Sequence, residues 1–240
     1  MKKITYTIIS ALLLAAGGSE GAMADEQVPV VLELFTSQGC SSCPAADALL
    51  QELAKDPGIV ALSFHVHYWD SLGWRDPFSS AENTNRQNQY AKNLNQNSVF
   101  TPQLIVGGTH STTGNDKAGA IDAIAAAHRV TRPIPITFTP VGEEHVLNVH
   151  IGAVDPGTLP SSIFVVRYRR HASTEVPTGE NAGRTLDSIN NVMELSKYAA
   201  WENKDVDFQL PISQNIDEGI AVFIQHDGQG RIISAQNFPK

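Results

Sequence analysis

Apolar and polar residues follow a mixed strand and helix pattern through the first half of the chain. β-type apolar runs alternate with helix-type stretches, and their order predicts a β-α-β-α-β-β-α unit. The expected elements are Val28–Phe35 (strand), Ala45–Lys55 (helix), Ile59–Val66 (strand), Ala81–Leu94 (helix), Gln103–Val106 and Thr109–Thr113 (strands), and Asp116–His128 (helix). A crossover helix favours a parallel first pair of strands, whereas the Gly107-Gly108 turn makes the last pair antiparallel.

The pattern changes after the proline-containing segment Arg132–Pro135, from which point short β-type runs predominate. These runs are Ile134–Thr139, His145–Ile151, Ile163–Arg169, Val206–Leu210, Ile220–His226 and Ile232–Asn237. We therefore expect an α/β domain over residues 25–131 and a smaller β-rich domain, sandwich- or barrel-like, over residues 132–240. The stretch Leu186–Trp201 fits either a helix or a strand.

Residues 1–24 have the pattern of a secretory signal peptide. Lys2 and Lys3 precede the apolar run Ile8–Ala16, and Ala22-Met23-Ala24 is a small-x-small cleavage signal. The apolar run is much shorter than the ~20 residues that span a bilayer. These features predict an exported protein, periplasmic or secreted, with no membrane segment after cleavage. The alternative is an uncleaved N-terminal anchor.

The composition indicates a folded, acidic protein. The 240 residues are 42% hydrophobic, and 17 basic against 25 acidic side chains give a formal charge of −8. Lys and Arg form no run longer than two residues in the sequence. Because nucleic-acid binding depends on neutralising phosphates, we expect no nucleic-acid partner.

The two cysteines, Cys40 and Cys43, lie between a buried-type strand and a helix. The unpaired N–H groups and partial positive charge of a helix start stabilise a thiolate. Cys40 stands at the boundary, so we expect it to be the more exposed, nucleophilic cysteine, with Cys43 resolving the mixed disulfide. The alternatives are a structural disulfide and a metal site. A ring this small constrains the unfolded chain by only about 2 kcal/mol, which favours the redox interpretation.

Two further features near the cysteines suggest roles in chemistry. Glu33 is the one acid of the first strand; directed at Cys43 it would accept the thiol proton, and otherwise it is a hydrogen-bonded strand carboxylate. His65 and His67 share one face of the second strand. Either His65 joins Cys40 and Cys43 in a copper or zinc site, or it is a buried hydrogen-bonding residue.

The segment that follows the second strand is rich in aromatic residues, among them Trp69 and Trp74. Open α/β sheets bind ligands beyond the carboxyl ends of their strands, so both tryptophans are candidate substrate contacts. The alternative is that they pack under the polar helix or against the second domain.

Four motifs stand out: Leu32–Asp47 (LELFTSQGCSSCPAAD), His65–Phe78 (HVHYWDSLGWRDPF), Val99–Gly108 (VFTPQLIVGG) and Gly179–Leu186 (GENAGRTL). Together they resemble a bacterial family of uncharacterised secreted proteins. The resemblance implies an α/β thioredoxin-like domain followed by a smaller β-rich domain. It also makes Cys40 and Cys43 a redox pair and Pro102 a cis-proline that shapes a substrate groove, with Thr101 among the substrate contacts.

The same resemblance leaves two points open. Ser-Ser between the cysteines differs from the Gly-Pro of thioredoxins, so the direction of electron flow is not fixed. In the last motif, Glu180, Asn181 and Arg184 either reach back to the first domain or complete a turn.

The leading hypothesis is an exported thiol–disulfide oxidoreductase-like protein. Its expected partners are a thiol or disulfide of a protein or small molecule and a redox partner that the sequence does not identify. No cofactor is expected besides the redox-active Cys40–Cys43 disulfide. One alternative is a copper- or other metal-binding protein that uses these cysteines and His65; the other is a non-catalytic binding module.

Overall fold

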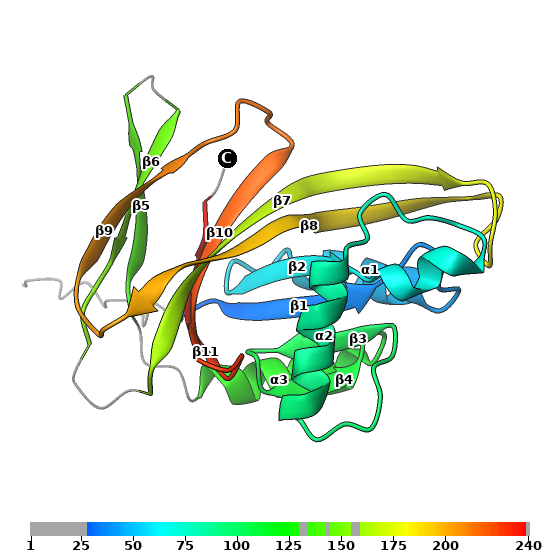
Figure 1. Cartoon of the computed structure of the whole chain (residues 1–240), viewed down its shortest axis with the longest axis horizontal. Helices are drawn as coiled ribbons and strands as arrows, with labels where there is room; N and C mark the ends of the chain where they lie inside the picture. The colour runs from blue at the N-terminus through cyan, green and yellow to red at the C-terminus, as the bar shows by residue number, and fades with distance from the viewer. Residues whose placement is uncertain (1–27, 130–133, 143–144, 155–158, 239–240) are drawn as a thin grey trace, which may run out of the picture.

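The computed structural model describes residues 28–129, 134–142, 145–154 and 159–238 (Figure 1). The predicted signal peptide, residues 1–24, and the predicted domain boundary between residues 131 and 132 lie outside the described residues. Among the helices of the described part of the chain, none has the length and apolar character needed to cross a membrane.

The predicted elements of the first half form in the expected order, and one unpredicted 3-10 helix is added between the second strand and the second helix. They are β1 (Val30–Thr36), α1 (Cys43–Leu53), β2 (Ile59–His65), the 3-10 helix η1 (His67–Leu72), α2 (Ala81–Asn93), β3 (Gln103–Val106), β4 (His110–Thr113) and α3 (Lys117–His128). β1 and β2 pair in parallel, and β3 and β4 pair antiparallel, as the pattern predicts. The helix α1 begins at Cys43, two residues before the predicted start, with Pro44 in its first turn.

Strands make up the second half. They are β5 (Ile136–Val141), β6 (Val146–Ile151), β7 (Ser161–Val176), β8 (Arg184–Trp201), β9 (Val206–Pro211), β10 (Glu218–His226) and β11 (Ile232–Asn237). The ambiguous stretch from Leu186 to Trp201 is therefore a strand. β7 and β8 form an antiparallel hairpin, much longer than the predicted run Ile163–Arg169.

The predicted fold class, a thioredoxin-like α/β domain followed by a smaller β-rich sandwich or barrel, is wrong. β7, β8, β10 and β11 do not form a separate sheet; they join β1 to β4 in one mixed sheet of eight strands. The order across that sheet is β11-β10-β7-β8-β2-β1-β3-β4, and the two halves meet where Asn191 of β8 pairs with Ser63 of β2. β5, β6 and β9 alone form a second, three-stranded sheet.

The pairing of β7 with β8 explains why the sequence pattern does not predict two long strands here. The register shifts between Ile163 and Phe164 and again between Arg167 and Tyr168. Such bulges place an extra residue in one strand and interrupt the alternation of apolar and polar positions. A single long strand therefore resembles short runs separated by polar turns, or a helix.

Helices cover both faces of the sheet around β1. On one face, Leu32 and Leu34 pack with Ala46 and Leu50 of α1 and with Ala120 of α3. On the other face α2 inserts Tyr90 into a cluster that contains β10 and β7 residues. The two faces of β1 are therefore buried in two different cores.

The three-stranded sheet buries its own apolar face against the far end of the large sheet. Leu147 and Val149 of β6 pack with Ile163 of β7 and Val222 of β10. Figure 1 shows the β7–β8 hairpin extending from this region across the molecule. The hairpin thus links the second core to the end of the sheet at which the cysteines lie.

Candidate functional site

The cysteines follow the carboxyl end of β1. Thr36, the last residue of β1, pairs with His65, the last residue of β2, so the segments after both strands leave the sheet side by side. Residues 37–42, here called the cysteine loop, follow Thr36, and η1 follows β2. Ligands of open sheets bind at such strand ends.

Cys40 and Cys43 form a disulfide with their Cα atoms 5.4 Å apart, which confirms the predicted pairing. Cys43 is the first residue of α1, and its backbone N–H donates to the carbonyl oxygen of Cys40 at 3.2 Å. The hydroxyl oxygen of Ser42 lies 3.4 Å from the sulfur of Cys40. The disulfide therefore occupies the N-terminus of the helix.

Both cysteines are buried. Cys40 is 1% exposed and Cys43 is 0% exposed, so the two cysteines hardly differ in exposure and the expectation that Cys40 is the more exposed one has little support. Trp69 of η1 lies against Gly39, where an added Cβ would come within 3.2 Å of the Trp69 Cβ. A glycine at this position therefore lets η1 pack closely over the cysteine loop.

The tip of the β7–β8 hairpin, residues 177–183, also covers the cysteine loop (Figure 1). The side-chain amide of Asn181 donates to the carbonyl oxygens of Gln38 at 2.9 Å and Cys40 at 3.0 Å. Arg184 donates to the Asn181 carbonyl oxygen at 2.8 Å. The segment therefore reaches back to the first half of the chain, and it also completes a turn, in which the N–H of Arg184 donates to the carbonyl oxygen of Asn181 at 3.1 Å.

Glu180 of the hairpin tip contacts the residue between the two cysteines. Its carboxylate accepts a hydrogen bond from the backbone N–H of Ser41 at 3.0 Å. The Ser41 hydroxyl and N–H hold the pKa of Glu180 below its usual value. Glu180 is exposed and hence ionised at neutral pH.

A buried ion pair lies beneath the cysteine loop. Nδ1 of His65 is 2.7 Å from Oδ2 of Asp76, and Nε2 of His65 is 2.8 Å from the side-chain oxygen of Asn191. Burial acts against protonation of His65, but Asp76 raises the pKa of His65 above its ordinary value. Burial would raise the pKa of Asp76, but His65 and backbone hydrogen bonds keep it below its ordinary value. Each partner therefore favours the charged form of the other.

Asp47 lies one helical turn after Cys43 on the same face of α1. Its Oδ1 atom is buried and has no hydrogen-bond partner among the described residues. Burial raises the pKa of Asp47 from 3.8 to about 6, against opposing effects of His65 and the Thr36 hydroxyl. Helical side chains generally lean toward the N-terminus of their helix, which favours an orientation of this carboxyl toward the turn that carries Cys43.

Glu33 is not brought to the cysteines. Its neighbours Leu32 and Leu34 face α1, so Glu33 points to the opposite face of β1, where Arg86 donates to it at 2.5 Å and the hydroxyl of Tyr90 also donates. Glu33 is therefore a hydrogen-bonded strand carboxylate, the alternative to a proton acceptor for Cys43. The structure does not support a proton-transfer role at Cys43.

The residues predicted for substrate contact gather around the cysteine loop. The Thr101–Pro102 peptide bond is cis. The Thr101 hydroxyl accepts a hydrogen bond from the indole N–H of Trp69 at 2.8 Å, and the indole N–H of Trp74 donates to the side chain of Gln38 at 3.0 Å. Both tryptophans are thus brought to the predicted place, with their N–H groups bonded within the protein.

The alternative metal site is not assembled. Cys40 and Cys43 are bonded to each other, and both ring nitrogens of His65 face Asp76 and Asn191. Within the part of the chain that the structure describes, no three or more His, Cys, Asp and Glu side chains form a group suited to holding a metal ion.

Comparison with known proteins identifies the family of this chain. A family described as "Protein of unknown function (DUF1223)" matches residues 31–225, a span that takes in the cysteine loop and the hairpin tip. The chain belongs to the DUF1223 family. The resemblance seen in the sequence is thereby confirmed as far as an uncharacterised family is concerned.

The solved structures that are similar to this DUF1223 protein include the following two. Protein AGR_C_4864 from Agrobacterium tumefaciens is 30% identical, with a TM-score of 0.75 over 90% of this chain and 96% of that one. HBP35 of Porphyromonas gingivalis is 15% identical, with a TM-score of 0.60 over 88% of this chain and 75% of that one, a likeness of fold alone. No curated protein matches the chain.

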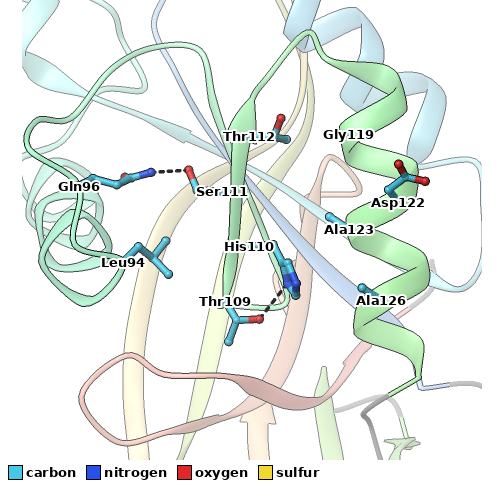
Figure 2. A pocket seen from close by; sticks show the side chains of 10 residues that line it. All are labelled: Leu94, Gln96, Thr109, His110, Ser111, Thr112, Gly119, Asp122, Ala123 and Ala126. Atoms are coloured by element: carbon cyan, nitrogen blue, oxygen red, sulfur yellow. Dashed lines mark hydrogen bonds between the residues drawn. The ribbon is translucent and has the colours of Figure 1, made fainter.

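A groove of about 590 Å³ lies along the edge strand β4 (Figure 2). It is lined by Leu94, Gln96, Thr109, His110, Ser111, Thr112, Gly119, Asp122, Ala123 and Ala126. None of these residues belongs to the cysteine loop, the hairpin tip or η1. The groove is therefore separate from the disulfide site of this DUF1223 protein.

Two site residues were missed by the sequence analysis. Asp47 carries a recognisable signal, because an acid four positions after a helix-start cysteine shares its face of the helix. Asp76 carries none, since it lies in an irregular segment whose position relative to His65 depends on the tertiary fold.

Proposed function

We propose that this DUF1223 protein carries out thiol–disulfide exchange through Cys40 and Cys43, on a thiol or disulfide of a protein or small molecule. The observation that carries the proposal is the half-buried Asp47, one helical turn after Cys43, whose Oδ1 atom is buried and has no hydrogen-bond partner among the described residues. Burying a carboxyl oxygen without a hydrogen bond is unfavourable, and a purely structural bridge has no use for it. Ionisable groups with shifted pKa values concentrate at functional sites.

The helix start favours Cys40 as the sulfur that reacts with substrate. The positive end of the α1 dipole stabilises a thiolate there, and the Ser42 hydroxyl, 3.4 Å away, is placed to donate a hydrogen bond to it. Cys43 lies further into the helix and is completely buried. It therefore suits the resolving role, in which it reacts only with Cys40.

In the oxidising direction, a substrate thiolate attacks the sulfur of Cys40. A substrate–Cys40 disulfide forms, the Cys40–Cys43 bond breaks, and Cys43 leaves as a thiolate that takes a proton from Asp47. A second substrate thiolate attacks the first substrate sulfur, and Cys40 leaves as a thiolate. Two electrons pass from two substrate thiols to the cysteine pair, and the protons those thiols release balance the protons that the cysteines take up.

In the reducing direction the steps reverse. The Cys40 thiolate attacks a substrate disulfide and releases one substrate thiolate. Asp47 then accepts the proton of Cys43, and the Cys43 thiolate attacks Cys40 to release the second substrate sulfur. The same carboxyl thus serves as acid in one direction and base in the other.

We infer that the exchange takes place in the periplasm or outside the cell. The signal-peptide pattern of residues 1–24 supports this location. The disulfide supports it as well, because such bonds persist in oxidising compartments.

Trapping of the mixed disulfide tests the proposal. Native Cys43→Ser protein is incubated with oxidised glutathione, and the adduct on Cys40 is measured by mass spectrometry. We expect an adduct with Cys43→Ser and little with Cys40→Ser, whose remaining thiol is buried within the helix. An adduct that forms on Cys43→Ser only after unfolding would overturn the proposal.

A second experiment tests the part assigned to Asp47. Asp47→Asn should slow closure of the Cys40–glutathione mixed disulfide by about 10²-fold, the lower end of the usual range for general acid–base catalysis. Glu52→Gln is the matched control, because Glu52 lies on the same helix but is exposed and paired with Lys117 at 2.6 Å. Equal closure rates in Asp47→Asn and wild type would remove Asp47 from the mechanism.

One observation favours a second candidate, a non-catalytic module with a permanent disulfide. Cys40 is 1% exposed under Trp69 and the hairpin tip, so substrate reaches its sulfur only if this cover moves. A permanent bridge would resist dithiols in the native protein and react only in the unfolded chain. The trapping experiment therefore distinguishes the two candidates.

A further inference from the structure

The hairpin tip supplies a carboxylate to the backbone between the two cysteines. Oε2 of Glu180 accepts the Ser41 N–H at 3.0 Å, across 139 positions of sequence. The tip is held in this place by contacts of three other residues. Asn181 binds the carbonyls of Gln38 and Cys40, the Thr178 hydroxyl donates to the carbonyl of Gly73, and Gly179 lies against Trp74.

The Ser41 N–H belongs to the residue that directly follows Cys40, in the loop before the start of α1. Free amides at a helix start and in the preceding loop donate hydrogen bonds to a thiolate and favour it. Here that amide donates to a carboxylate, which adds a negative charge beside the position of the thiolate. Both effects disfavour the charged, reduced form of Cys40 and leave the neutral disulfide unaffected.

We propose that Glu180 is a positioning residue of the redox centre, which withholds the Ser41 amide from reduced Cys40 and so biases the cysteine pair toward the disulfide. This inference rests on the proposed function, since it concerns the equilibrium of the same exchange. The hairpin tip therefore both covers Cys40 and sets its redox balance. A substrate that displaces the tip exposes the sulfur and frees the Ser41 amide in the same movement.

Other charged groups around the cysteine loop act in both the wild type and the variants. Asp47, His65 and Asp76 lie beneath it, and Arg184 lies behind Asn181. Their contributions cancel when variants of Glu180 are compared with wild type. The comparison therefore isolates the carboxylate at the tip.

The experiment compares Glu180→Gln, Glu180→Ala and Glu175→Gln with wild type. Glutamine keeps an acceptor for the Ser41 N–H and removes the charge, whereas alanine removes both. Glu175→Gln is the control, because Glu175 is exposed on β7 of the same hairpin, outside the tip. Each protein is equilibrated with glutathione buffers, and the fraction of dithiol is measured after acid quenching and alkylation.

Glu180→Gln should shift the equilibrium about threefold toward the dithiol, and Glu180→Ala about tenfold, which corresponds to about 30 mV. Glu175→Gln should match wild type. Equal shifts in Glu180→Gln and Glu175→Gln would mean that only the net charge of the protein matters, and would overturn the inference. No shift in either Glu180 variant would overturn it as well.

A second measurement does not depend on exchange. In the Cys43→Ser background, the ultraviolet absorbance of the Cys40 thiolate is titrated against pH. Glu180→Gln should lower the midpoint relative to Glu175→Gln, and an unchanged midpoint would overturn the inference. If wild type fails to equilibrate with glutathione while this midpoint still moves, the proposed function fails and the influence of Glu180 on Cys40 stands.

Discussion

Nδ1 of His65 lies 2.7 Å from Oδ2 of Asp76, and that same oxygen accepts the backbone N–H of Gln38 at 2.8 Å. The buried pair therefore ties the end of β2 to the cysteine loop that follows β1. The ion pair holds the cysteine loop from beneath. The hairpin tip, which is distant in sequence, holds the same loop through Asn181.

Asp76→Asn keeps the size of the side chain and removes its charge. Breaking a buried ion pair leaves an uncompensated charge and costs about 3–5 kcal/mol. We expect this loss in the free energy of unfolding, measured by urea denaturation near pH 6. Because the pKa of His65 is raised, its share of the stabilisation is complete below pH 6.5 and is lost as pH rises through the folded-state pKa.

The contribution of Asp76 to the free energy of unfolding depends on pH in the opposite direction, because the pKa of Asp76 is lowered from 3.8. This contribution is present above pH 3.8 and is lost as pH falls through the folded-state pKa. The difference between wild type and Asp76→Asn should therefore be largest between about pH 4 and pH 6.5. A difference independent of pH would contradict the ion pair.

Asp47→Asn should stabilise the protein at neutral and alkaline pH. Burial raises the pKa of Asp47 to about 6 from 3.8, so the folded state binds the proton more tightly than the unfolded state does. The stability from this group is complete below pH 3.8 and is lost as pH rises through about 6. The shift of about two pKa units corresponds to about 3 kcal/mol.

Urea denaturation of wild type and Asp47→Asn across pH checks this expectation. The variant should be more stable above pH 7 by up to about 3 kcal/mol, and the two should coincide below about pH 4. A variant less stable than wild type at every pH would show that the Asp47 carboxyl has a partner that stabilises its charge.

Asn181→Ala should loosen the cover over Cys40. Its side chain makes two hydrogen bonds to the cysteine loop, which at about 0.5–1.5 kcal/mol each stabilise the docked tip by about 1–3 kcal/mol. In the Cys43→Ser background, Cys40 should therefore react with iodoacetamide about tenfold faster. Asn148→Ala, on the three-stranded sheet, is the control; an equal rate in both variants would mean that Asn181 does not hold the cover.

Glu33→Gln should affect stability and leave the exchange unchanged. It breaks the buried pair with Arg86, which lowers the free energy of unfolding by about 3–5 kcal/mol. Since Glu33 faces away from α1, the rate of mixed-disulfide closure in the folded variant should equal that of wild type. A slower closure in protein that remains folded by circular dichroism would restore a role for Glu33 near Cys43.

Apart from η1, the elements of the first half were accessible to sequence analysis because each carries a local signal. The Gly107-Gly108 turn fixes the β3–β4 hairpin, since both glycines have positive φ angles. The strand-to-helix junction at Cys43 likewise follows from the residues on either side of it. For such elements the neighbours in sequence supply most of the information.

The sheet as a whole was not accessible in this way. β8 joins β2 through long-range pairing, and the bulges in β7 and β8 conceal the alternation of apolar residues. The orientation of Glu33 was equally hidden, because every position of β1 is buried and no alternation distinguishes its two faces. The contact of Glu180 with Ser41 depends on both strands having their full length.

The account depends on a disulfide that opens and closes while the chain stays folded. Its most direct test is a titration of native protein in glutathione buffers, begun once from the disulfide and once from the dithiol. We expect both series to converge on one midpoint with the response of a two-electron couple, a tenfold change in ratio for about 30 mV. Two series that never converge, with the oxidised chain unchanged until a denaturant is added, would contradict the account.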